Sequence, residues 1–208
     1  MADEKKNSLQ ELESDEFRLQ SECAISLLKA KLQIINSELS VKYGRDVIQT
    51  ITSRIKSVDS TKAKMIRKGY KNNYETALLK ITDLVGVRAV MSFMDDIYRV
   101  ADILLSHKDV ELVTIKDYIK EPKPTGYRSL HLIVKVPVYF SDGAKMITVE
   151  VQLRTSAMDF WAGLDHQLRY KQGKKKAKLI GEELKKYSEV VAGVDQRMVE
   201  LRDQIEAI

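Results

Sequence analysis

The stretch at residues 122–140, PKPTGYRSLHLIVKVPVYF, constrains the fold more than any other part of the chain. It opens as a turn, because Pro122 and Pro124 carry no backbone donor and Gly126 permits a positive φ. Residues 130–136 then follow the period of a strand, with one face wholly apolar. We therefore expect a loop that leads directly into a buried strand.

The loop and the start of the strand carry basic and aromatic side chains: Lys123, Tyr127, Arg128 and His131. An aromatic ring can stack on a base, and cations can meet phosphates. These side chains therefore suit a flat, anionic ligand. The alternative that stays open is a surface turn whose tyrosine caps the core.

A second strand follows across a tight turn, for which residues 141–143 (SDG) are suited. Its sequence, KMITVEVQLRT, separates into an apolar face and a polar face. The apolar face holds Val149, Val151 and Leu153, and the polar face holds Thr148, Glu150, Gln152 and Arg154. Such a polar row is either a solvated sheet face or the floor of a site. Because the hairpin places it beside the strand with His131, we favour the site.

Two further strands carry charge in half-buried or interior positions. Residues 46–56 place Arg54 and Lys56 on one face, which costs desolvation free energy unless an anion meets them or the face is solvated. The next strand, LVGVRAVMSF, is apolar on both faces and so is expected inside the sheet. Asp83 at its entry and Arg88 within it therefore need partners.

Apolar residues at steps of three and four predict helices around these strands. A long helix is expected from Phe17 to a stop at Gly44, whereas residues 1–15 are polar and expected to fray. Shorter helices are expected at residues 60–70, 73–81, 95–107 and 157–168, and a basic linker at 173–178. The last helix has a heptad stripe from Ile180 to Ile205, which requires a helical partner in its own chain, another subunit or both.

Composition narrows the class of protein. The chain is 44% hydrophobic, enough for a core, and its net charge of +5 with a pI near 9.1 favours phosphorylated ligands. Cys23 is the single cysteine, which excludes disulfide scaffolds and cysteine-rich zinc sites. The N-terminus is polar and no apolar run is long enough for a membrane span, so we expect a soluble, cytoplasmic protein.

The polar residues that strands and turns direct inward form one candidate site. They are Arg54, Lys56, Asp83, Arg88, Lys123, Tyr127, His131, Glu150 and Gln152. Phosphoryl transfer uses such a set, because one carboxylate can hold Mg²⁺, another can accept a proton, and cations neutralise phosphate oxygens. The sequence contains no P-loop and no GxGxxG motif, and His107, His131 and His166 form no metal-ligand pattern.

Five segments in order, SRIKSVDSTKAK, DLVGVRAV, KPTGYRSLH, EVQLRT and MDFWAGLDHQLRYK, resemble the synthetase domain of the RelA/SpoT family. The chain is most similar to the small alarmone synthetases of the RelQ/RelP type. The resemblance implies an α+β fold: a nucleotidyltransferase-like mixed sheet flanked by helices, with N- and C-terminal helical extensions. It divides the chain into a helical extension at 1–44, a catalytic domain at 45–172 and an oligomerisation helix at 173–208.

The resemblance also implies the reaction: transfer of the β,γ-pyrophosphate of ATP to the 3′-hydroxyl of GDP or GTP, which gives the stringent-response alarmones ppGpp or pppGpp and releases AMP. It assigns Asp83 and Glu150 to catalysis and to Mg²⁺, with Glu150 activating the hydroxyl. It assigns ATP to Arg54, Lys56, Ser60, Lys64 and Arg88, of which the two arginines flank the adenine. It assigns the acceptor to Lys123, Thr125, Tyr127, His131 and Gln152, with Tyr127 stacked on guanine.

The resemblance further implies a homotetramer built from the terminal helices, with (p)ppGpp or RNA as an effector. The paired His-Asp motif of the hydrolase domain is missing, so we expect no alarmone hydrolysis. The preferred acceptor among GDP, GTP and GMP stays open. Two alternatives remain: a nucleotidyltransferase acting on RNA ends, and a non-catalytic RNA-binding module that uses residues 60–70 and 173–178.

Overall fold

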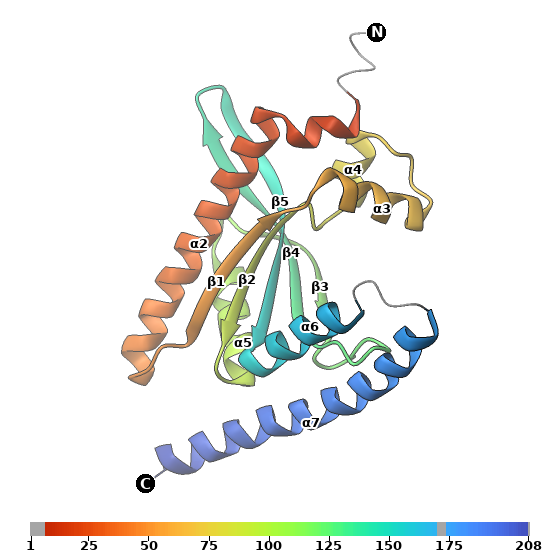
Figure 1. The fold of residues 1–208 in the computed structure, drawn as a ribbon. Helices are drawn as coiled ribbons and strands as arrows, with labels where there is room; N and C mark the ends of the chain where they lie inside the picture. The colour runs from red at the N-terminus through yellow and green to blue at the C-terminus, as the bar shows by residue number, and fades with distance from the viewer. Residues whose placement is uncertain (1–6, 170–173, 208) are drawn as a thin grey trace.

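The computed structural model describes residues 7–169 and 174–207 (Figure 1). In chain order the elements are η1 (Leu9–Glu13), α2 (Asp15–Tyr43), β1 (Ile48–Ile55), α3 (Val58–Lys68), α4 (Tyr74–Lys80), β2 (Val85–Met91), α5 (Met94–Ser106), β3 (Glu111–Asp117), β4 (Leu130–Phe140), β5 (Gly143–Thr155), α6 (Ser156–Arg169) and α7 (Lys174–Glu206). A mixed sheet flanked by helices, with long helices near both termini, confirms the expected α+β fold.

The five strands lie in the order β1-β2-β5-β4-β3. β2 and β5 pair in parallel, and the other neighbours pair antiparallel. In this register Arg88 lies opposite Gln152, and Gln152 lies opposite His131. The register therefore aligns polar side chains from three neighbouring strands on one face of the sheet.

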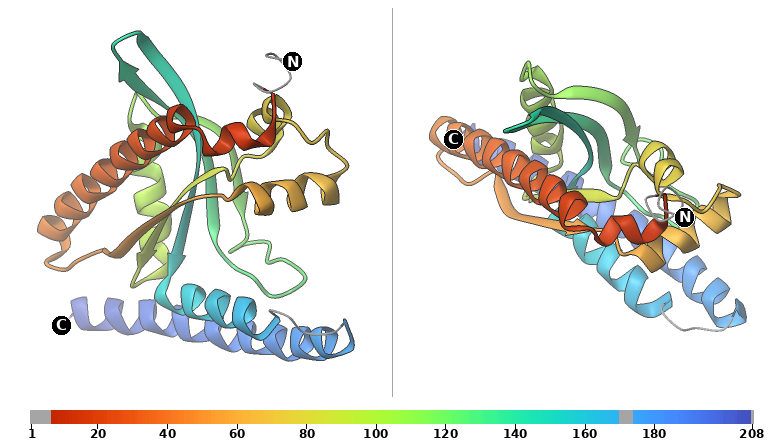
Figure 2. Two further views of the ribbon diagram at one scale, coloured as in Figure 1. Left: turned by 45° about the horizontal axis from the view of Figure 1, so that its top comes forward. Right: turned by 90° about the horizontal axis from the view of Figure 1, so that it is seen from above.

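The opposite face of the sheet holds the hydrophobic core. Figure 2 shows α2 lying along this face, and its apolar stripe is buried there through Leu28, Leu32 and Ile35. The hydroxyl of Ser14 accepts from the Phe17 N–H at the start of α2, and Gly44, with φ of 65°, ends it as the sequence predicts. One face of the sheet is thus closed and the other is left for a site.

The expectation that residues 1–15 fray is wrong for residues 7–15; residues 1–6 lie outside the described part of the chain. Residues 9–13 form η1, where Leu9 and Leu12 are buried against the core. Two leucines three apart in a polar segment are sufficient to dock a single helical turn. The expected linker is also wrong in part, because residues 174–178 already belong to α7.

α7 packs beside α6 of the same chain, as both views in Figure 2 show. The indole N–H of Trp161 donates to the carbonyl of Leu184 at 2.8 Å, and Thr155 donates to Asp195 at 2.7 Å. The hydroxyl of Ser188 donates to the carbonyl of Gly126 in the loop between β3 and β4. α7 therefore braces the loop that the sequence analysis singled out.

The apolar stripe of α7 is only partly covered in the described structure. Leu184 is 4% exposed, whereas Ile205 is 62% exposed. Val194, Met198 and Leu201 also remain exposed. α6 thus provides the helical partner for the first part of the stripe alone. Among the described residues, no helix is both long enough and apolar enough to cross a membrane.

Candidate active site

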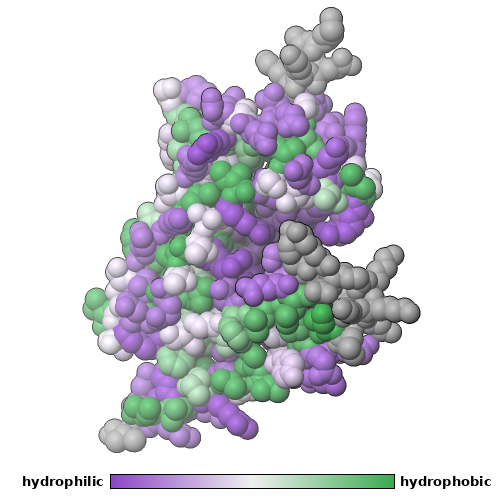
Figure 3. Space-filling view, viewed as in Figure 1, coloured by the Kyte–Doolittle hydropathy of each residue, from purple (hydrophilic) through white to green (hydrophobic). Residues whose placement is uncertain are grey.

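A polar cleft of about 590 Å³ lies on the sheet face opposite α2. In Figure 3 hydrophilic surface occupies the middle of the molecule, between α3 and α6, and hydrophobic side chains gather below it over α6 and α7. Most of the predicted site residues line the cleft: Arg54, Lys64, Asp83, Arg88, Lys123, Tyr127, His131, Glu150 and Gln152. Cations greatly outnumber carboxylates among the lining side chains, which suits a polyphosphate ligand.

Asp83 lies at the entry of β2, between two lysines. The backbone N–H of Lys56 donates to the carbonyl of Leu84 at 2.7 Å, which joins the end of β1 to the start of β2. Lys56 Nζ lies 3.1 Å from Asp83 Oδ2, and Lys64 Nζ lies 2.8 Å from Asp83 Oδ1. Burial raises the pKa of Asp83, but the hydrogen bonds and charges of the two lysines outweigh it and hold that pKa below its ordinary value. The carboxylate is therefore ionised at neutral pH.

Glu150 is 7% exposed in the middle of β5, where hydrogen bonds reach both of its oxygens. His131 Nδ1 lies 3.1 Å from Oε1, and the amide of Gln152 donates to Oε2 at 2.6 Å. Burial, together with the positive charges of Arg154 and Lys123, lowers the pKa of His131 despite its contact with Glu150. Burial alone would raise the pKa of Glu150, but the hydrogen bonds from His131 and Gln152 have the larger effect and hold that pKa below its ordinary value. A neutral imidazole beside an ionised carboxylate is the arrangement that follows.

Tyr127 lies beside this pair in the braced loop. Its hydroxyl is 2.8 Å from His131 Nε2 and accepts from Arg154 Nη2 at 2.6 Å. The ring of Tyr118 meets that of Tyr127 edge-on, with 5.9 Å between centroids. Lys123 Nζ lies 4.7 Å from the centroid of the Tyr127 ring, so a cation covers the ring that was predicted to stack on a base.

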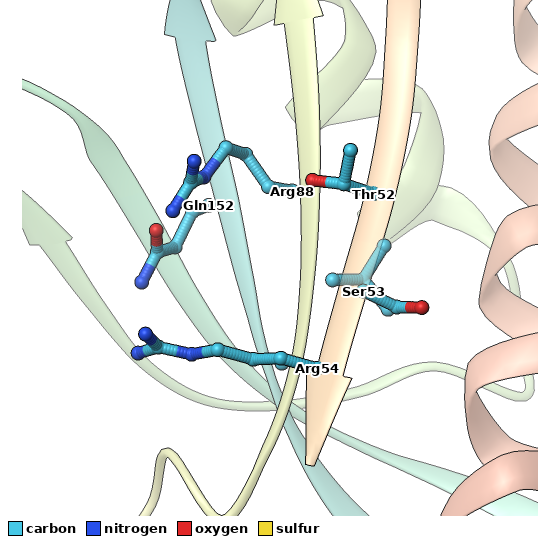
Figure 4. Close-up of a pocket in the computed structure, with 7 residues that line it drawn as sticks. Thr52, Ser53, Arg54, Arg88 and Gln152 are labelled. Atoms are coloured by element: carbon cyan, nitrogen blue, oxygen red, sulfur yellow. The ribbon is translucent and has the colours of Figure 1, made fainter. Parts of the chain in front are cut away.

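The second half of the site lies where β1, β2 and β5 adjoin. Figure 4 shows the head groups of Arg54, Arg88 and Gln152 on one side of the sheet and Ser53 on the other. The three head groups line a smaller hollow of about 160 Å³ that adjoins the cleft. Arg88 Nη1 also donates to Asp159 Oδ1 on α6 at 3.1 Å. Two planar guanidinium groups across a hollow can hold a flat ring between them.

Three predicted residues do not line the cleft. Lys56 reaches it only through Asp83. Ser60 is exposed on α3, where its hydroxyl accepts from Ser57. Thr125 lies in the loop between β3 and β4 without lining the cleft.

The structure also brings in residues that the prediction left out: Arg67, Lys68, Lys116, Tyr118 and Arg154 line the cleft. Arg154 had a usable signal, because strand alternation places it on the same face as Glu150 and Gln152. The others lie on helices, strand ends or loops whose positions depend on the tertiary fold. Asp159 was also missed, since a carboxylate on a helix gives no sign of its partner.

The carboxylates of the cleft fit a magnesium ion that phosphates also bind. Asp83 and Glu150 face the same cleft, and the negative charge of Asp83 acts to raise the pKa of Glu150. Among the described residues, no cluster of three or more His, Cys, Asp or Glu side chains could hold a metal ion alone. Mg²⁺ commonly takes one or two carboxylates together with substrate phosphates and water, so this donor set matches it.

Comparison with known proteins identifies relatives of this chain. The model of a protein family described as "Region found in RelA / SpoT proteins" matches residues 53–175. The GTP pyrophosphokinase YwaC of Bacillus subtilis is 38% identical over 183 residues, covering 88% of this chain and 87% of the relative. The GTP pyrophosphokinase YjbM of the same organism is 35% identical over 184 residues, covering 88% and 85%.

Solved structures agree with the sequence relatives. Small alarmone synthetase 1 from Bacillus subtilis, bound to its product pppGpp, superposes with a TM-score of 0.83 at 33% identity, covering 92% of this chain and 97% of that one. The same synthetase bound to AMPCPP gives a TM-score of 0.74 at 30% identity, covering 93% and 99%. The similarity thus extends over nearly the whole of each chain.

Proposed function

The chain belongs to the RelA/SpoT family, and from this premise we propose how its cleft performs the family's reaction. The protein is a GTP pyrophosphokinase of the small alarmone synthetase type, which makes pppGpp from ATP and GTP. We propose that the β,γ-pyrophosphate of ATP moves to the 3′-hydroxyl of GDP or GTP and that AMP is released.

One observation carries the mechanism: Glu150 lies between an arginine-lined hollow and an aromatic loop, within a cationic cleft. Arg54 and Arg88 would hold the adenine of ATP between their guanidinium groups. Tyr127 would stack on the guanine of the acceptor after Lys123 moves from its ring to a phosphate. The two nucleotides would then meet at the carboxylate.

Glu150 would accept the proton of the 3′-hydroxyl while the oxygen of that hydroxyl attacks the β-phosphorus of ATP. The bond between that phosphorus and the bridging oxygen to the α-phosphate breaks, and the bridging oxygen leaves with AMP. Lys56 and Lys64 would move from Asp83 to phosphate oxygens, with Ser60 at the start of α3 as a further contact. His131, Gln152 and Thr125 would position the acceptor.

The enzymes of this family are metal-dependent, and we propose Mg²⁺ as the ion. Asp83 would hold it, with Glu150 as the second carboxylate ligand. When bound, Mg²⁺ would neutralise charge on the phosphates that the cations of the cleft also contact.

We further propose that the protein is a cytoplasmic homotetramer, because its substrates are the soluble nucleotides of the cytoplasm and the exposed stripe of α7 needs a partner. A (p)ppGpp or RNA effector also remains a proposal, as does the division at residues 44 and 172. The relatives favour transfer between nucleotides over the two RNA alternatives.

The test is to incubate the protein with Mg²⁺, γ-labelled ATP and GDP, GTP or GMP in turn, and to separate the nucleotides. We expect label in a guanosine product together with released AMP, and the yields rank the acceptors. Label released as free phosphate or pyrophosphate, with no guanosine product, would reject the mechanism. Glu150→Gln serves as the control, because it removes the proposed base and keeps the shape of the side chain.

A further inference from the structure

Arg154 determines which groups donate and which accept in the hydrogen bonds around Glu150. It is 4% exposed on β5, two residues beyond Gln152. Its Nη2 donates to the Tyr127 hydroxyl at 2.6 Å and to Gln152 Oε1 at 3.0 Å. Its Nη1 donates to Asp159 Oδ1 at 3.0 Å, which fixes the guanidinium. An arginine side chain can only donate, and an ionised carboxylate such as Glu150 can only accept.

The first branch runs through Tyr127 and His131. Because the Tyr127 oxygen accepts from Arg154, its own proton is free to point at His131 Nε2, 2.8 Å away. Nε2 then accepts, so the neutral imidazole carries its proton on Nδ1. Nδ1 lies 3.1 Å from Glu150 Oε1 and donates to it. The opposite tautomer would set a nitrogen lone pair against the carboxylate.

The second branch runs through Gln152. Its Oε1 accepts from Arg154, so its amide nitrogen must face the other way. That nitrogen donates to Glu150 Oε2 at 2.6 Å. With Gln152 reversed, an amide oxygen would face the carboxylate and an NH₂ group would face the guanidinium. Arg154 at one end and Glu150 at the other thus exclude the wrong orientation in both branches.

We propose that Arg154 is a positioning residue for Glu150: it fixes the His131 tautomer and the Gln152 amide so that each donates to one carboxylate oxygen. A carboxylate has about four lone-pair sites, so about two remain for the acceptor hydroxyl and a metal ion. The same guanidinium also holds the Tyr127 ring in place. The role of Glu150 that this positioning serves rests on the proposed function.

The test combines kinetics with nitrogen NMR of isotopically labelled histidine, at a pH well above the usual histidine range. His107→Gln and His166→Gln spectra assign the His131 signals. In the wild-type protein we expect the Nδ1–H tautomer of His131. Arg154→Met, similar in length but without donors, should give a mixture of tautomers and a kcat lower by about 10- to 10²-fold, the scale of a slightly misplaced group. The KM for ATP should stay within about two-fold.

Arg154→Lys should restore part of kcat, because one ammonium group can reach only some of these acceptors. Arg197→Met, at an exposed position on α7, controls for the loss of an arginine as such. Folding of each variant is checked by circular dichroism. A folded Arg154→Met protein that keeps the Nδ1–H tautomer would overturn the proposal, whatever its kcat. A wild-type protein without pyrophosphate transfer would instead reject the proposed function, and the tautomer would still decide the role of Arg154.

Discussion

The ammonium group of Lys64 lies 2.8 Å from Oδ1 of Asp83, at a carboxylate to which the proposed reaction assigns a metal ion. Lys56 holds the other oxygen at 3.1 Å. Because a divalent cation at this carboxylate would repel both ammonium groups, we expect metal binding to displace at least one lysine. The lysine that it releases is then available for a phosphate, so metal and nucleotide are expected to bind together.

Asp83→Asn should lower kcat by about 10²-fold or more at ordinary Mg²⁺ concentrations, since a metal contribution of several kcal/mol disappears with the ligand. The measurement is pyrophosphate transfer across a Mg²⁺ titration. Asp59→Asn, an exposed carboxylate on α3, is the matched control. Full activity of Asp83→Asn at all Mg²⁺ concentrations would remove Asp83 from the metal site.

The stability of the protein should depend on Asp83 in acid. Its folded-state pKa lies below the ordinary value of 3.8, so the folded protein binds fewer protons than the unfolded chain. This stabilisation is fully present above pH 3.8 and is lost as the pH falls through the folded-state pKa. The free energy of unfolding, measured with urea in the presence of EDTA, should therefore fall more steeply below about pH 4 for the wild type than for Asp83→Asn. If the free energy of unfolding depended on pH in the same way for both proteins, the ion pairs of Asp83 with Lys56 and Lys64 would be contradicted.

Glu150→Gln should lower kcat by about 10²- to 10⁴-fold, the usual contribution of a general base. ATP binding should remain, because the glutamine keeps the shape of the side chain and the two arginines proposed to hold the adenine are untouched. Single-turnover rates and equilibrium binding of a non-hydrolysable ATP analogue separate the two effects. A wild-type rate would exclude Glu150 as the base.

Tyr127→Ala should weaken the guanosine nucleotide far more than ATP. Stacking of a base on an aromatic side chain contributes about 1–3 kcal/mol, or roughly 5- to 160-fold in affinity. Tyr127→Phe keeps the ring and removes only the hydroxyl, so it separates stacking from the hydrogen bonds to Arg154 and His131. The KM values for both substrates provide the measurement, and an equal rise in both would argue against stacking.

Gly126→Ala should destabilise the protein by about 1–3 kcal/mol, as overpacking does. An added Cβ would lie 2.8 Å from Ser188 Cβ, and the φ of +91° is itself unfavourable for alanine. Gly163→Ala on α6 is the matched control, since nothing lies within 4 Å of its added Cβ and alanine favours a helix. Thermal unfolding measures both, and equal stability of the two variants would show that α7 does not press on the loop.

The strands and the position of Asp83 and Glu150 in the cleft could be predicted because their signals are local. Alternation in β5 is enough to place Glu150 and Gln152 on one face, and the hairpin brings His131 beside them. The parallel pairing of β2 with β5 depends instead on residues far apart in sequence, so the contact between Arg88 and Asp159 had no local signal.

The features that the sequence did not predict also depend on contacts between residues far apart in the chain or on patterns too short to recognise. Arg154 lies on the predicted polar face, but its partner Tyr127 reaches it only through the folded loop. The link from Ser188 to Gly126 was not foreseen, because Ser188 lies outside the apolar stripe by which the helix was recognised. η1 was missed because two leucines are too few for a periodic pattern.

The bond between Ser188 and Gly126 joins residues 62 positions apart and has a consequence for synthesis on the ribosome. All five strands of the sheet, and the hollow that β1, β2 and β5 line, are complete once β5 has emerged. The loop between β3 and β4 gains its bond to Ser188 only after α7 has been translated. A nascent chain that ends before Ser188 would therefore have the hollow for ATP but an unbraced loop for guanosine nucleotides. We therefore expect alarmone synthesis to begin only after the last helix has been made.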